Sequence, residues 1–92
     1  MARKRDDLSV SVSSSAFGST VVSLTRKQYA MYQLLDSVGS TGIPGDALRE
    51  SLQLSVNSMR VLKTGLNHRL RSAGVQVMNM GHGVYRLHDI TV

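Results

Sequence analysis

The chain contains no cysteine among its 92 residues, and this absence excludes three kinds of chemistry. Without thiols there is no disulfide scaffold, no thiolate zinc site and no cysteine nucleophile. The absence also fits a reducing compartment. Long apolar runs are missing as well, because no stretch approaches the roughly 20 residues that cross a bilayer. We therefore expect no membrane partner.

A secretory signal is also lacking. Residues 1–5 are basic, as the start of such a signal would be, but no run of about 7–15 apolar residues follows them. We therefore expect a cytoplasmic protein. The charge distribution described below adds the expectation that it associates with the nucleoid.

Acidic side chains are few and scattered, which argues against an enzyme. No two of them are placed for general acid–base work: Asp6, Asp7, Asp36, Asp46, Glu50 and Asp89. The histidines lack the spacing and the carboxylate companions of a metal site: His68, His82 and His88. We therefore predict a non-enzyme with no metal, no cofactor and no small-molecule substrate.

Positive charge is present and unevenly distributed. The whole chain carries a net charge of +5, and residues 55–92 carry five Lys and Arg against Asp89 alone, a net +4. Charge gathered in one half of a short chain favours a polyanionic partner that approaches one face, such as a nucleic acid. The alternative is a basic surface that serves only solvation.

The first elements follow from local patterns. Residues 8–13 alternate apolar and polar side chains, which is typical of a half-buried strand, and the β-branched segment 20–24 predicts a second strand. The two strands predict an N-terminal β-hairpin. It would open a single domain over residues 8–92, preceded by a disordered basic arm at residues 1–7. This arm would add non-specific attraction to a nucleic acid, enter a minor groove or serve only as a solubilising tail.

Two helices are predicted after this hairpin. Thr25 and Gln28 have the spacing of a capping box, so the first helix begins there and its apolar period carries it to about Val38. Ile43 is expected to make a short strand contact. A short second helix then spans residues 45–52 and opens near a proline, which suits a helix start.

The third helix is predicted to begin after Ser55, a suitable N-cap, and to reach about Ser72. Its core stripe would consist of Met59, Leu62, Leu66 and Leu70. The opposite side would carry Asn57, Arg60, Val61, Thr64, His68 and Arg71. Gly65 weakens this helix by roughly 1 kcal/mol relative to alanine. Close packing or close approach to a backbone would each explain it.

A second hairpin ends the chain. Residues 75–80 and 84–88 read as strands on either side of a three-residue loop, Gly81 to Gly83. Only this loop length puts four apolar side chains on one face: Val75, Val77, Tyr85 and Leu87. Gly83 supplies the left-handed residue that such a loop needs at its end.

The order of elements predicts an α+β fold, with an N-terminal β-hairpin, three helices of helix-turn-helix type and a C-terminal β-hairpin wing. Four segments then resemble the OmpR/PhoB-type winged helix-turn-helix DNA-binding domain, over about residues 20–88. LTRKQYAMYQLL at 24–35 is similar to the family's LTxxE[FY]xLLxxL, and ALRE at 47–50 is similar to its short second helix. Residues 58–71 resemble its recognition helix, and GHGVYRL at 81–87 resembles its closing RGxGYRL with one extra residue.

The departures from the family narrow what the resemblance implies. The 92 residues include no receiver domain, so phosphorelay control is not expected, and the N-terminal sheet is a single hairpin. The connection between the second and third helices is only residues 53–55, which argues against the polymerase contact that a longer loop makes in the family. The chain looks like a small stand-alone regulator of the kind found in phages and mobile elements.

The resemblance implies sequence-specific binding of double-stranded DNA, with the third helix in the major groove and the wing on the backbone or in the minor groove. Asn57 and Arg60 would read base edges, and Val61 and Thr64 would contact thymine methyl groups. Phosphates or sugars would be contacted by Lys63, Asn67, His68 and Arg71, by His82 and Arg86 of the wing, and by Arg26 and Lys27 at the start of the first helix.

Three functions fit this interpretation. The first is transcriptional regulation, by a homodimer or by tandem copies on DNA. The second is that of an excisionase, or recombination directionality factor. The third is a winged helix that binds a protein partner, such as an anti-activator, because fold alone does not determine function.

Overall fold

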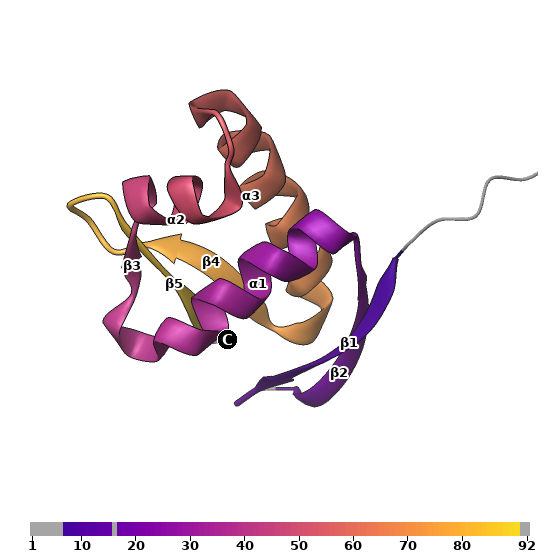
Figure 1. The fold of residues 1–92 in the computed structure, drawn as a ribbon. Coiled ribbons are helices and arrows are strands. Elements are labelled where there is room, and N and C mark those ends of the chain that lie inside the picture. The colour runs from indigo at the N-terminus through magenta and orange to yellow at the C-terminus, as the bar shows by residue number, and fades with distance from the viewer. Residues whose placement is uncertain (1–6, 16, 91–92) are drawn as a thin grey trace, which may run out of the picture.

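The computed structural model describes residues 7–15 and 17–90, so all of the arm predicted at residues 1–7 except Asp7 lies outside the described part. Over the described residues the protein is a small α+β domain with three α-helices and two small antiparallel sheets (Figure 1). The predicted α+β class is confirmed. The elements are β1 (Leu8–Ser14), β2 (Gly18–Leu24), α1 (Arg26–Val38), the 3-10 turn η1 (Gly39–Thr41), β3 (Ile43–Pro44), α2 (Gly45–Leu52), α3 (Val56–Leu70), the 3-10 turn η2 (Arg71–Ala73), β4 (Val75–Asn79) and β5 (Val84–Asp89).

The N-terminal hairpin pairs β1 with β2 in an antiparallel register that sets Leu8 opposite Leu24. Its inward side chains join the core, because Val12 and Val22 are buried while Ser9, Ser11 and Ser13 of β1 are exposed. Asp7, at the start of the described residues, accepts a hydrogen bond from the Ser23 hydroxyl. One face of this hairpin therefore covers the helices, as its alternating pattern predicts.

Helix α1 begins with the predicted capping box. The Thr25 hydroxyl accepts from the Gln28 backbone N–H at 3.2 Å, and the Gln28 side chain accepts from the Thr25 N–H at 3.0 Å. Gln28 is buried, and a Cβ added to Gly65 of α3 would lie 3.0 Å from its Nε2. Gly65 thus serves close packing of α3 on α1. Figure 1 shows α1 crossing the middle of the molecule, where it contacts both sheets.

Helix α3 buries one side against this core. Met59, Leu66 and Leu70 are buried and Leu62 is partly buried, which confirms the predicted stripe. The predicted end near Ser72 was too late, because the α-helix stops at Leu70 and continues as the 3-10 turn η2. The tighter turn follows from the left-handed Gly74, which ends the segment with φ +75° and bonds its N–H to the Arg71 carbonyl.

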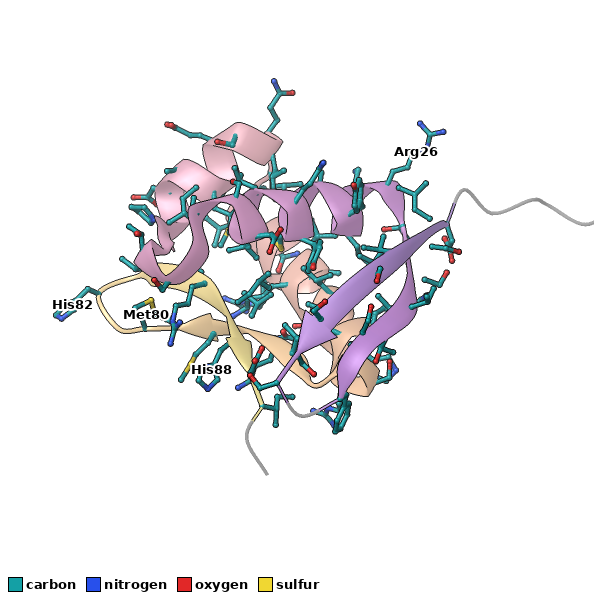
Figure 2. All side chains as sticks on the ribbon, turned by 90° about the horizontal axis from the view of Figure 1, so that it is seen from below. Arg26, Met80, His82 and His88 are labelled. Carbon is teal, nitrogen blue, oxygen red and sulfur yellow. The ribbon has the colours of Figure 1, made fainter. Side chains whose placement is uncertain are left out.

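The second sheet has the strand order β3-β5-β4. Ile43 pairs with Tyr85, so the predicted strand contact of Ile43 is confirmed. Val77 pairs with Leu87 and the turn contains three residues, as the parity argument requires. Gly83 has the expected positive φ, and His82 at the tip has one as well, +57°. Figure 2 shows His82 projecting from this turn, with Met80 and His88 along the C-terminal hairpin.

In the part of the chain that the structure describes, no helix combines the length and the apolar character needed to cross a membrane.

Candidate nucleic-acid interface

The outer side of α3 is the largest predicted site, and the structure leaves it uncovered. The predicted division of this helix into two sides is confirmed, since Met59 and Leu66 are buried and the opposite residues are exposed. Val61 is 64% exposed although it is apolar, so none of residues 7–15 and 17–90 covers the middle of this face. We define the α3 face as the exposed residues Asn57, Arg60, Val61, Thr64, His68 and Arg71.

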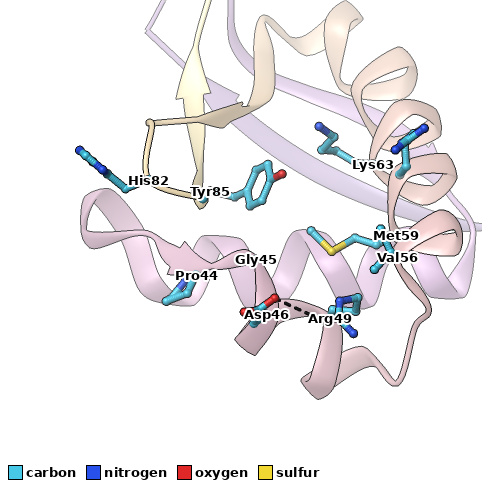
Figure 3. Close-up of a pocket in the computed structure, with 11 residues that line it drawn as sticks. Pro44, Gly45, Asp46, Arg49, Val56, Met59, Lys63, His82 and Tyr85 are labelled. Atoms are coloured by element: carbon cyan, nitrogen blue, oxygen red, sulfur yellow. Dashed lines mark hydrogen bonds and ion pairs between the residues drawn. The ribbon is translucent and has the colours of Figure 1, made fainter.

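A groove of about 390 Å³ adjoins the α3 face (Figure 3). It lies between α3, the start of α2 and the turn of the C-terminal hairpin. Its polar and aromatic lining consists of Asp46, Arg49, Arg60, Lys63, His82 and Tyr85. Arg60 therefore belongs both to the α3 face and to this groove, which we call the basic groove.

The floor of the basic groove is built by a close contact between α2 and the hairpin. The Gly45 N–H donates to the Gly83 carbonyl at 2.7 Å. A Cβ on Gly45 would lie 2.9 Å from Cε2 of Tyr85, so this position has no room for a side chain unless the ring moves. Glycine at the first residue of α2 therefore lets the hairpin dock against the helix.

Lys63 is the cation nearest this floor. Its Nζ lies 5.1 Å from the centroid of the Tyr85 ring, which is within the range of a cation–π contact. In Figure 3 the Tyr85 ring points across the groove toward Lys63, while His82 projects outward. Lys63 was predicted to flank the α3 face, and the structure holds it half-buried inside the basic groove.

Two further charged residues of the basic groove were missed from the predicted site. Arg49 donates from Nη2 to Oδ1 of Asp46 at 3.1 Å, on the first two turns of α2. Neither Asp46 nor Arg49 was predicted to belong to a binding site. The signal was present, because residues three apart on a helix are neighbours. Their position in a groove depends on the docking of the hairpin, which no local pattern reveals.

Asn67 was predicted to contact a phosphate, and the structure shows that its side chain also has a structural role. Its Oδ1 accepts from the Val77 N–H at 2.5 Å, and its Nδ2 donates to the Val77 carbonyl at 3.4 Å. Both ends of the amide are thus bonded to the backbone of β4. Asn67 ties α3 to the edge of the second sheet.

Arg86 lies on the outward side of the hairpin, as predicted, but it is half-buried. Its Nη2 is 3.4 Å from Nδ1 of His88, and its Nε is buried without a hydrogen-bond partner among the described residues. Beside it, Met78 and Met80 are 37% and 45% exposed. The outward side of the hairpin is therefore apolar as well as basic.

The two predicted residues at the start of α1 occupy different places. Lys27 lines a hollow of about 280 Å³ together with Asn57 and Val61, so it belongs beside the α3 face. Arg26 is exposed, and Figure 2 shows it at the opposite end of the molecule from His82. Arg26 and the hairpin tip therefore do not lie on one flat surface of the molecule.

Metal-binding geometry is absent from the part of the chain that is described, where no three His, Asp or Glu side chains gather closely enough to hold an ion.

Searches for related proteins found no match to the chain among family models, curated proteins or solved structures. Any functional assignment therefore depends on the surface chemistry of the chain itself.

Proposed function

We propose that the chain is a winged helix-turn-helix protein that binds double-stranded DNA in a sequence-specific manner, as a transcriptional regulator. The observation that carries the proposal is the α3 face, an exposed side that runs along the 15-residue helix α3 into η2 and bears Arg60, Arg71 and no acidic residue. A helix of this kind fits the major groove, where base edges present a distinguishable pattern of donors and acceptors.

The roles of individual residues follow from their position on α3. Arg60 offers a bidentate donor for guanine and Asn57 an amide for adenine, and both lie on the exposed N-terminal half of the helix. Val61 and Thr64 offer apolar contact to thymine methyl groups. His68 and Arg71 lie toward the other end and contact phosphates or sugars.

The C-terminal hairpin would act as the wing. His82 at its tip is exposed, and the hairpin and α3 border the basic groove, where Lys63 lies. Positive side chains that flank a recognition helix position the duplex without reading its sequence. Lys27 supplies a similar contact from α1. Asn67 is not included, because β4 already occupies its amide.

Selection of bound duplexes from a random pool tests the proposal, followed by titration of the selected site over a range of salt concentrations. Phosphate contacts make the logarithm of the affinity fall steeply with the logarithm of salt concentration. Arg60→Ala should cost about 1–3 kcal/mol and relax preference at one base pair. Arg86→Ala should weaken all duplexes to a similar extent. Equal losses on every sequence for Arg60→Ala would move Arg60 to the phosphate-binding residues.

One observation favours a second candidate function, a winged helix that binds a protein partner. Met78 and Met80 expose apolar surface on the outward side of the hairpin, next to Arg86. Exposed methionines are common at adaptable protein-binding surfaces. Absence of duplex binding by the folded protein at low salt would remove the DNA-binding proposal and leave this one.

A further inference from the structure

The basic groove contains an acidic side chain where a phosphate would be expected to enter. Arg49, Arg60 and Lys63 line the groove with permanent positive charge, and Asp46 is the only acidic residue of its lining among the residues that the structure describes. A phosphate that approaches these cations meets the Asp46 carboxylate at the start of α2. The groove therefore combines attraction for an anion with one opposing charge.

The opposing charge is paired with one of the cations. Arg49 and Asp46 lie 3.1 Å apart, with the Asp46 side chain 92% exposed and the Arg49 side chain 31% exposed. Ion pairs as open to water as this one are weak and exchange readily. Within residues 7–15 and 17–90, neither side chain has a second ion-pair partner. Arg49 can thus change partner at little cost.

A phosphodiester is a good second partner for Arg49. The planar guanidinium matches the geometry of phosphate oxygens and binds two of them at once. The ion pair of Arg49 with Asp46 does not use this two-bond geometry. Arg60, on the facing helix, lines the same groove, so a phosphate placed there would be approached from α2 and from α3. The exposed Asp46 carboxylate is free to turn into solvent.

We propose that the Asp46–Arg49 pair limits the strength of phosphate binding in the basic groove: Asp46 holds Arg49 in the free protein, and a backbone phosphate of DNA displaces Asp46 from Arg49. The inference rests on the proposed function. As a consequence, Asp46 lowers the affinity for every duplex alike. A larger share of the binding free energy then comes from the base contacts of the α3 face.

The test replaces Asp46 by asparagine and measures binding by fluorescence anisotropy. The probes are a labelled selected duplex and a labelled scrambled duplex, each at several salt concentrations. Asp46→Asn should bind both duplexes about fivefold to tenfold more tightly at low salt. Because Arg49 binds the same phosphate in both proteins, the slope of log K against log salt concentration should stay close to its wild-type value.

Two comparisons separate the groove from net charge. Glu50→Gln changes the net charge by the same amount on the same helix, but Glu50 is exposed and does not line the groove, so its affinity for both duplexes should rise much less. Arg49→Gln should flatten the slope by about 0.9, because it removes one phosphate contact. The double variant Asp46→Asn/Arg49→Gln should keep this flatter slope and should gain less affinity from Asp46→Asn than the wild type does. Asp46→Ser, which a helix start tolerates, repeats the test if the asparagine variant unfolds.

The outcomes are distinguishable. Equal affinities for Asp46→Asn and Glu50→Gln would overturn the role of the ion pair while leaving DNA binding by the wild type intact. A wild-type protein that binds neither duplex at low salt would overturn the proposed function and this inference with it. Tighter binding by Asp46→Asn than by Glu50→Gln, with a smaller gain when Arg49 is also replaced by glutamine, would establish the exchange.

Discussion

Replacement of Asn67 by alanine should destabilise the domain without weakening its electrostatic attraction to DNA. Val77 is buried and lies on β4, the edge strand of the β3-β5-β4 sheet, and its N–H and C=O are bonded to the Asn67 amide. Alanine leaves both backbone groups without this partner. The 2.5 Å bond to the N–H dominates the loss, because the 3.4 Å bond is long.

The size of the effect follows from two opposing contributions. A buried donor without a partner costs about 1–3 kcal/mol. Alanine forms helices better than asparagine by up to about 0.7 kcal/mol, which offsets part of that cost. The expected net loss is about 1.5 kcal/mol, or a fall in melting temperature of about 6–12 °C for a domain of this size.

Thermal and urea unfolding, followed by circular dichroism, measure this loss. Asn67→Asp keeps the acceptor for the Val77 N–H and should lose less than half as much stability. Thr64→Ala is the matched control, because Thr64 lies three residues earlier on the exposed side of α3. The reasoning fails if Asn67→Ala is as stable as Thr64→Ala. A salt slope flattened by about 0.9 at unchanged stability would instead make Asn67 a phosphate ligand.

Two further perturbations test other contacts. Gly45→Ala should destabilise the fold by about 1–2 kcal/mol in urea unfolding, because the new Cβ would lie 2.9 Å from the Tyr85 ring and force it to move. A Gly45→Ala variant as stable as the wild type would show that the ring moves without cost. The Ser15 hydroxyl and then its backbone N–H donate to the Asp89 carboxylate, and these hydrogen bonds lower the pKa of that carboxylate. Asp89 therefore contributes stability above about pH 4, and this stability is lost as the pH falls through the lowered pKa. Stability measured between about pH 5 and about pH 2 should therefore fall less in Asp89→Asn than in the wild type, and equal falls would contradict this role.

The parts of the fold that could be predicted are those set by neighbours in the chain. Thr25 and Gln28 stand three residues apart, so the capping box required no knowledge of the tertiary structure. The buried stripe of α3 and the three-residue turn from Gly81 to Gly83 followed from periodicity and parity in the same way. The exposed α3 face was predictable for this reason, because it is the complement of the stripe.

The parts that could not be predicted depend on contacts between elements. Asn67 stands at the margin of the α3 stripe, where a phosphate contact and a backbone contact have the same local pattern. Only the approach of β4 decides between them. Gly65 was equally ambiguous until the packing of Gln28 against it was known. The basic groove exists because Gly45 bonds to Gly83, a contact between residues far apart in the sequence.

These contacts hold α3 from three directions. Gly65 packs on Gln28 of α1, Asn67 bonds to β4, and Lys63 lies over a ring of β5. A helix held in this way presents its outer side in one orientation relative to the hairpin, which reduces the ordering cost of binding a rigid partner. Loss of one such contact should therefore reduce affinity through geometry. Where the altered residue is uncharged, as for Asn67, the affinity should fall while the salt slope stays at its wild-type value, which separates a positioning role from a phosphate contact.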